Sequence, residues 1–496
     1  MIFFHRKKTK RNFCLLLAAC ICVSSFLCDS FTSCATLAEL EAAAEERKSL
    51  PIQSNEIEGW PTGPEISAQS AILMDVNTGV ILYAKNIHEK AYPASTTKLL
   101  TCLLAMENGN LDDMVTFSRD AVYSVPADGS NMGMDAGQAI TLEECLYGIL
   151  VGSANEVANA VAEHISGSID GFVSLMNEYA ASIGCTDSHF MNTNGLQDDN
   201  HYTTAYDLAQ ISRRFFQNEM LCKIGNTARY HFEPTSTQPD DFYLNNKHKL
   251  ISGEIPYDGI LGGKTGYTDE ARQTLVTCAE QNGMKLVCVV FKEESPAQFT
   301  DTVELFDYGF NNFQTMNISE KEEKYNIEPS GFFQTGNDIF GSSKPILSVD
   351  SDSYVILPNT ASFDELDSEI VYGEEDEDYL AQINYTYQNT FVGSAYVELV
   401  TDAASSYEFD TVQEPVESGD AALQEPVEDT KGPIFINVKK LLLFVIALAA
   451  VTIVLFIIHA LILNNGAAKR RSNRVKRKKK RRDYIRSDFN DFDFYT

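Results

Sequence analysis

Ser95 and Lys98 are the pair of residues in this chain whose types and spacing most clearly suggest chemistry. They lie three positions apart where an apolar run begins, and on a helix residues three apart share a face, so the hydroxyl and the amine can meet. A serine becomes a nucleophile when a base takes its proton, and a lysine can be that base if burial or nearby charge lowers its pKa. The same spacing also arises by chance around a solvated lysine, so the pair needs further support.

Two downstream triplets supply that support: Ser153-Ala154-Asn155 and Lys264-Thr265-Gly266. Each triplet alone is more often a loop or a helix cap. Together with the first pair they give the order S-x-x-K, S-x-N, K-T-G at domain-scale separations, which is typical of serine β-lactamases and penicillin-binding proteins. The set predicts an enzyme that forms an acyl-serine intermediate.

The elements that must position these motifs can be read from hydrophobic periodicity. Two short strands at 71–74 and 80–83 flank a turn at 77–79 and predict a hairpin. Further strands are expected at 274–279 and 285–291, with an edge strand carrying Lys264. Helices are expected at 141–150, 154–166, 169–183 and 296–311. The pattern indicates a sheet with a helical block beside it.

Both ends of the chain carry targeting patterns. Residues 1–35 combine a basic start, an apolar core and small residues, which predicts a cleaved signal peptide. Residues 441–463 are 23 residues without formal charge and predict a transmembrane helix. The basic tail at 464–496 predicts a single-pass cell-membrane protein with a cytoplasmic C-terminus and an extracytoplasmic catalytic domain.

The intervening sequence divides by composition. Residues 36–66 read as an exposed lead-in with a short helix, and 67–314 as the catalytic domain. Residues 315–401 have short alternating runs that predict a small β-sandwich domain. Residues 402–433 are acidic, contain a repeated Gln-Glu-Pro-Val-Glu and predict a disordered stalk.

Charge and cysteine content narrow the function further. Between the signal and the span lie 22 of the 39 basic residues and 65 of the 70 acidic ones, a net charge of about −43. Such a surface argues against a nucleic-acid partner. The cysteines lack metal-ligand spacing, and four of them lie in apolar patterns that predict core positions, so we expect neither a metal nor a cofactor. Those four are Cys102, Cys145, Cys278 and Cys288.

Residues 67–311 resemble the D-alanyl-D-alanine carboxypeptidases, which are low-molecular-mass penicillin-binding proteins. The resemblance rests on the three motifs and on flanking signatures at 75–86, 92–98, 192–196, 201–208 and 258–271. It implies an α/β (α+β) fold of the serine β-lactamase and penicillin-binding-protein type, followed here by the small all-β domain and the transmembrane helix. It also implies peptidoglycan stem peptides as substrate and β-lactam antibiotics as covalent inhibitors.

The resemblance assigns roles to matching positions. Ser95 is the nucleophile, Lys98 its base, and Ser153 the relay of a proton to the leaving D-alanine. The implied substrate-binding residues are Asn155, Lys264, Thr265, Gly266 and Tyr267, with the oxyanion held by the backbone N–H groups of Ser95 and Tyr267. Arg272 and Lys292 are candidates for a further contact to the substrate carboxylate, and the six histidines from His88 to His248 are interpreted as structural.

Two other functions remain open from the sequence. A serine β-lactamase shares the motifs but must deacylate quickly, and the Glu233-Pro234-Thr235 stretch only superficially matches the element that class A enzymes use for this step. A non-catalytic penicillin-recognising receptor is disfavoured by the intact Ser95, Lys98, Ser153 and Lys264.

Overall fold

The computed structural model describes residues 37–126, 128–322, 347–372 and 381–399. The chain divides into two units, residues 1–407 and 408–496, and every described residue lies in the first. The predicted signal peptide, stalk, transmembrane helix and basic tail therefore lie outside the described residues. None of the helices described is long and apolar enough to cross a membrane.

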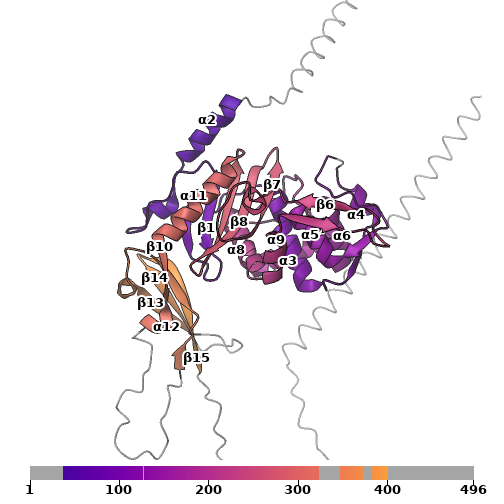
Figure 1. Ribbon diagram of the computed structural model, residues 1–496. Coiled ribbons are helices and arrows are strands. Elements are labelled where there is room, and N and C mark those ends of the chain that lie inside the picture. Colours follow the sequence, from indigo (N-terminus) through magenta and orange to yellow (C-terminus); the bar gives the residue numbers. More distant parts are fainter. Residues whose placement is uncertain (1–36, 127, 323–346, 373–380, 400–496) are drawn as a thin grey trace, which may run out of the picture. The chain divides into compact units, whose positions relative to one another are not determined.

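A five-stranded antiparallel sheet in the order β2-β1-β9-β8-β7 forms the centre of the catalytic region (Figure 1). Its strands are β1 (Ser70–Asp75), β2 (Ile81–Lys85), β7 (Ile260–Thr268), β8 (Arg272–Gln281) and β9 (Met284–Glu293). The predicted hairpin, the two later strands and the edge position of the Lys264 strand are all confirmed. Among the described strands, β7 pairs with β8 alone and so forms an edge of the sheet.

Side chains alternate across this sheet, so each strand contributes to two cores. On β1, Ile72 and Met74 pack with the helical block, whereas Ala71 and Leu73 pack beneath α11 (Ala297–Asn312). Figure 1 shows α11 along one side of the sheet and the helical block on the other. The four cysteines predicted as core residues are buried and free.

The helical block agrees with the sequence to within one or two residues where helices were predicted. It contains α3 (Lys98–Asn108), α4 (Arg119–Tyr123), α5 (Leu142–Val151), α6 (Asn155–Ser166), α7 (Ile169–Ser182), α8 (Ala205–Phe216) and α9 (Glu219–Gly225). The helix α2 (Leu37–Lys48) precedes the sheet. Short elements are η1 (Gln53–Glu56), η2 (Ala94–Thr97), α10 (Lys249–Ser252) and two pairs of strands: β3 (Met114–Thr116) with β4 (Ala139–Thr141), and β5 (Arg229–Phe232) with β6 (Phe242–Asn245).

The region after α11 is rich in strands, in keeping with its predicted β character. Strand β10 (Phe313–Asn317) pairs with β12 (Tyr354–Pro358), and a four-stranded sheet has the order β11-β15-β14-β13. Its strands are β11 (Leu347–Val349), β13 (Asp367–Tyr372), β14 (Ala381–Tyr387) and β15 (Thr390–Leu399), with the short helices α12 (Ile318–Lys321) and η4 (Phe363–Glu365) between strands. The sandwich architecture and the domain bounds stay predictions.

A buried carboxylate joins this β region to the catalytic sheet. Asp75, at the end of β1, is fully buried, and it accepts hydrogen bonds from Thr78 in the hairpin turn and from the Tyr354 hydroxyl at 3.1 Å. Trp60 packs nearby against Phe313, with ring centroids 5.1 Å apart. Burial raises the pKa of Asp75, while these donors oppose the shift.

We expect Tyr354→Phe to lower the free energy of unfolding by about 1.5 kcal/mol, because it removes a donor from a buried carboxylate. Urea unfolding can be followed through Trp60, the single tryptophan of the chain. Tyr372→Phe is the matched control, because Tyr372 is 78% exposed and should change stability by less than about 0.5 kcal/mol. Equal stabilities of the two variants would contradict the role given to Tyr354.

Candidate active site

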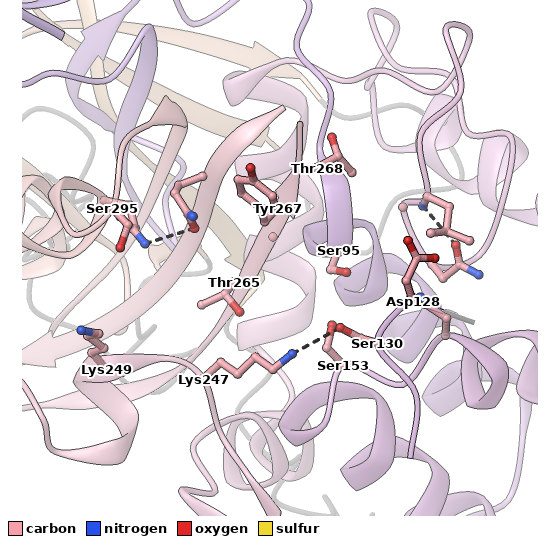
Figure 2. Close-up of a pocket in the computed structure, with 18 of the residues that line it drawn as sticks. Ser95, Asp128, Ser130, Ser153, Lys247, Lys249, Thr265, Tyr267, Thr268 and Ser295 are labelled. Atoms are coloured by element: carbon pink, nitrogen blue, oxygen red, sulfur yellow. Dashed lines mark hydrogen bonds between the residues drawn. The ribbon is translucent and has the colours of Figure 1, made fainter. Parts of the chain in front are cut away.

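The three motifs meet at one cleft of about 450 Å³. Figure 2 shows Ser95, Ser153, Thr265 and Tyr267 around it, contributed by η2, the loop before α6 and the edge strand β7. Asn155 and Gly266 also line the cleft. Lys98 and Lys264 lie behind this surface and are 0% and 2% exposed. The structure thus brings all eight predicted site residues together.

A strained turn presents Ser95 to the cleft. The preceding residue, Ala94, has a φ of 49°, a left-handed conformation that non-glycine residues rarely adopt. Two glycines allow the backbone to pack closely around it: a Cβ on Gly195 would lie 1.7 Å from the Ala94 carbonyl oxygen, and one on Gly266 would lie 3.0 Å from the Ser95 nitrogen. The close packing fixes the direction in which the Ser95 hydroxyl points.

Lys98 has three polar neighbours. Its Nζ donates to Asn155 Oδ1 at 2.6 Å and to the Asn194 carbonyl oxygen at 2.7 Å, and it lies 2.9 Å from Ser95 Oγ. None of these groups is a carboxylate. Burial, followed by the nearby Lys264 cation, lowers the pKa of Lys98 well below its usual range. The environment therefore favours the neutral amine, which is the form that can accept a proton.

Ser153 and Lys264 form a second pair across the cleft. Ser153 has a φ of 61°, so the two serines of the motifs, Ser95 and Ser153, lie directly after or at a left-handed residue. Lys264 Nζ donates to Ser153 Oγ at 3.0 Å and to the Thr265 carbonyl oxygen at 2.8 Å. Burial and the Lys247 cation lower the pKa of Lys264 to about 7. Its charge is thus sensitive to what binds in the cleft.

The basic residues at the cleft differ from those considered in the sequence. Lys247 and Lys249 line it, and Lys247 Nζ donates to Ser130 Oγ at 3.3 Å (Figure 2). Arg272 instead forms two hydrogen bonds with Glu294, at 3.0 and 2.7 Å, and Lys292 is exposed and does not line the cleft. Arg272 also donates to the hydroxyl of the cleft residue Tyr267 at 3.3 Å. Neither Arg272 nor Lys292 belongs to the cleft lining, whereas Lys247 and Lys249 do.

Glu233 does not contribute to the cleft either. Its side chain is 80% exposed and lies 3.8 Å from His231 on the β5–β6 hairpin. The residue that superficially matched a β-lactamase deacylation element is therefore not placed to activate a water at Ser95. Among the described residues, no group of three or more His, Cys, Asp or Glu side chains could hold a metal ion.

His201 supports the strained turn from beneath, a contact that the sequence did not suggest. Its Nδ1 accepts from the Met191 backbone N–H at 3.0 Å, so Nε2 carries the proton and donates to Thr97 Oγ1 at 2.8 Å. Thr97 Oγ1 donates in turn to the Ala94 carbonyl oxygen at 2.9 Å. Burial lowers the pKa of His201 to about 4, so the imidazole ring is neutral near pH 7. The chain of bonds holds Ala94, and through it Ser95, in place.

Comparison with known sequences identifies the relatives of this chain. Residues 58–295 match the Peptidase_S11 family model, described as D-alanyl-D-alanine carboxypeptidase. The chain is 33% identical over 260 residues to D-alanyl-D-alanine carboxypeptidase DacF of Bacillus subtilis, covering 52% of this chain and 65% of that relative. It is 30% identical over 307 residues to DacA of Escherichia coli K12, covering 60% of this chain and 72% of that relative.

Solved structures of penicillin-binding proteins have a fold similar to that of this chain. The crystal structure of penicillin binding protein 5 from Haemophilus influenzae superposes with a TM-score of 0.55 at 26% identity, covering 69% of this chain and 99% of that one. Penicillin binding protein 6B from Escherichia coli gives a TM-score of 0.52 at 24% identity, covering 70% and 99%. The predicted penicillin-binding-protein fold is confirmed.

We expect His201→Leu to slow acylation of Ser95 by a fluorescent penicillin on the order of 10- to 100-fold, because Thr97 loses its donor and the turn shifts. His201→Gln is the conservative control, since its amide N–H can reach the same hydroxyl, and should remain within a few-fold of wild type. Stopped-flow acylation rates measured on variants with native circular dichroism check this. A His201→Leu protein that acylates at the wild-type rate would show that His201 only fills space.

Proposed function

The chain belongs to the D-alanyl-D-alanine carboxypeptidase family of serine enzymes, and we propose that it removes the terminal D-alanine from peptidoglycan stem pentapeptides. The observation that carries this proposal is the buried Lys98 amine 2.9 Å from the Ser95 hydroxyl, at the floor of an open cleft. The reaction passes through an acyl-enzyme on Ser95.

Acylation requires Lys98 to accept the proton of the Ser95 hydroxyl. A neutral amine has two N–H donors and one lone pair. The two donors are used by Asn155 Oδ1 and the Asn194 carbonyl oxygen, so the lone pair is directed at Ser95 Oγ. Ser95 then attacks the carbonyl between the two D-alanines while Lys98 takes its proton.

The tetrahedral intermediate is stabilised by hydrogen bonds from the backbone N–H groups of Ser95 and Tyr267 to its oxyanion. Its collapse releases D-alanine, whose nitrogen receives a proton from the Ser153 hydroxyl, and the proton taken up by Lys98 restores that hydroxyl. Lys264, 3.0 Å from Ser153 Oγ, favours the relay by stabilising the transient negative charge on that oxygen.

The free carboxylate of the substrate binds at the basic end of the cleft. The Thr265 hydroxyl donates to it, and Gly266 lets the substrate backbone approach β7 without a side chain in the way. Lys247 and Lys249, which line this end, add positive charge beside Lys264. Two lysines in the lining and a third directly behind it, in an otherwise acidic chain, support a carboxylate ligand.

Substitution of Ser95 tests its role as the nucleophile. Ser95→Ala should abolish D-alanine release from a pentapeptide and covalent labelling by penicillin, because the cleft then lacks the only hydroxyl within reach of the Lys98 amine among the described residues. Amino-acid analysis of the released D-alanine and intact-protein mass spectrometry measure the two effects. Labelling of Ser95→Ala at another serine would overturn the assignment.

Substitution of Lys98 tests its role as the base. Lys98→Ala and Lys98→Arg should both slow acylation at least about 1,000-fold, because alanine has no lone pair and arginine stays charged. In wild type, kcat/KM should rise with pH as Lys98 loses its proton, at a pH well below that of an ordinary lysine. Acylation by Lys98→Arg at near the wild-type rate would rule Lys98 out as the base.

The runner-up, a serine β-lactamase, differs in the lifetime of the penicillin adduct. The exposed position of Glu233 removes the residue considered for fast deacylation. Time-resolved mass spectrometry should therefore detect a long-lived acyl-enzyme. Rapid turnover of penicillin without accumulation of the adduct would favour the β-lactamase instead.

Membrane anchoring is part of the proposal and rests on the sequence alone. A helix of 23 residues rises about 1.5 Å per residue and spans the roughly 30 Å hydrocarbon core, and the basic cluster after residue 463 resists translocation. Residues 441–463 are accordingly the anchor, with the catalytic domain outside and the tail at 464–496 in the cytoplasm.

Protease added to intact protoplasts should therefore remove the catalytic domain and leave a small basic fragment in the membrane. Immunoblots against a C-terminal tag and against the catalytic domain measure both products. Protection of the catalytic domain in intact protoplasts would contradict the topology and, with it, a peptidoglycan substrate.

A further inference from the structure

A second cavity of about 430 Å³ is formed by α4, the loop that follows it and the first turn of α6. We call it the Glu156 groove. Its apolar lining comes from Val122, Val125, Pro126 and Met134, and its polar lining from Tyr123, Asn131, Asp135 and Glu156. No role in the proposed reaction falls on any of these residues.

Glu156 is the unusual member of this lining because its carboxylate is buried and only partly satisfied. The residue is 2% exposed. Its Oε1 accepts from the backbone N–H groups of Met132 at 2.7 Å and Gly133 at 3.2 Å. Its Oε2 is buried and has no hydrogen-bond partner among the described residues. An unpaired carboxylate oxygen away from water is costly, so a ligand that donates to it gains binding free energy.

The chemistry of the lining selects the ligand. Ionised carboxylates only accept hydrogen bonds, whereas an ammonium group only donates them. A second acid, Asp135, adds negative charge to the same cavity and disfavours anions. The four apolar residues offer a surface for methylene groups, along which amine-bearing side chains commonly pack. Burial raises the pKa of Glu156, whereas hydrogen bonds from the backbone N–H groups of residues 132–134 oppose this shift. A bound cation would likewise favour the ionised carboxylate.

We propose that the Glu156 groove is a second ligand site, which binds a primary ammonium group on a short aliphatic stem. The ammonium donates to Glu156 Oε2, which turns toward the groove on binding because water does not reach it in this structure, and the stem packs against Val125 and Met134. The site adjoins the catalytic cleft but is separate from it: residues 128–130 of the loop line the cleft, and 131, 133, 134 and 135 line the groove.

The shared loop links the two sites through α6. Asn155, which accepts from Lys98, donates its backbone N–H to the Ser130 carbonyl oxygen at 2.9 Å. The next residue, Glu156, holds Met132 and Gly133. Because Asp128 in the cleft could also attract an ammonium group, a binding test must have the cleft filled.

The test uses the purified full chain after acylation of Ser95 with benzylpenicillin, which fills the catalytic cleft. The probe is n-butylammonium, titrated by saturation-transfer NMR. We expect saturable binding, with n-butanol and butanoate at least about 10-fold weaker, because a hydrogen bond to a charged group is lost in one case and like charges meet in the other. Equal affinity for n-butanol and n-butylammonium would overturn the proposal.

Three variants locate the binding. Glu156→Gln keeps an oxygen for Met132 and Gly133 but removes the charge, and should weaken n-butylammonium binding about 10- to 100-fold. Val125→Trp fills the apolar wall without altering Glu156 and should also abolish saturation. Glu163→Gln, on the same helix and outside the groove lining, is the matched control and should bind like wild type.

Penicillin acylation of each variant verifies that it is folded, and none of the binding measurements depends on D-alanine release. Wild-type affinity in both Glu156→Gln and Val125→Trp would place the ammonium elsewhere and overturn the assignment.

Discussion

The burial of the Lys98 amine is the constraint on which the rest of the active site depends. A lysine in water is a cation and cannot take a proton from serine. Here the amine is enclosed by an amide oxygen, a backbone carbonyl and the serine itself, with a second lysine close by and no carboxylate in contact. Desolvation disfavours the charged form, and the two acceptors orient the neutral one.

The surrounding fold excludes water from the Lys98 amine and orients the Ser95 hydroxyl toward it. The helix α3 starts at Lys98 itself and packs against α5, α6 and α8, which encloses the amine. The preceding turn is held in a left-handed conformation by the glycine at 195 and by the hydrogen-bond chain from His201 through Thr97. The edge strand β7 then leaves an open side along which a peptide can lie next to Ser95.

The sequence predicted the parts of this arrangement that depend on local pattern. Alternation and helical periodicity placed the hairpin, the later strands and the helix that carries Asn155. The sequence could not indicate Lys247, because this residue belongs to no motif. The fold brings it to the cleft, where its Nζ donates to Ser130 Oγ on a loop that is distant in the sequence. The ion pair of Arg272 was invisible in the sequence for the same reason: its partner, Glu294, adjoins it only after β8 and β9 pair. The left-handed backbone at Ala94 and Ser153 is likewise invisible in residue type, since neither is glycine.

The protonation state of Lys98 in the resting enzyme tests this account most directly. With 13C-labelled lysines, the Cε resonance of Lys98 can be assigned by its absence from Lys98→Arg and followed as a function of pH. We expect it to titrate well below the ordinary range of a lysine side chain, so that the amine is neutral where the enzyme works. A Lys98 resonance that titrates together with the exposed lysines would show a protonated amine beside Ser95 and contradict the account.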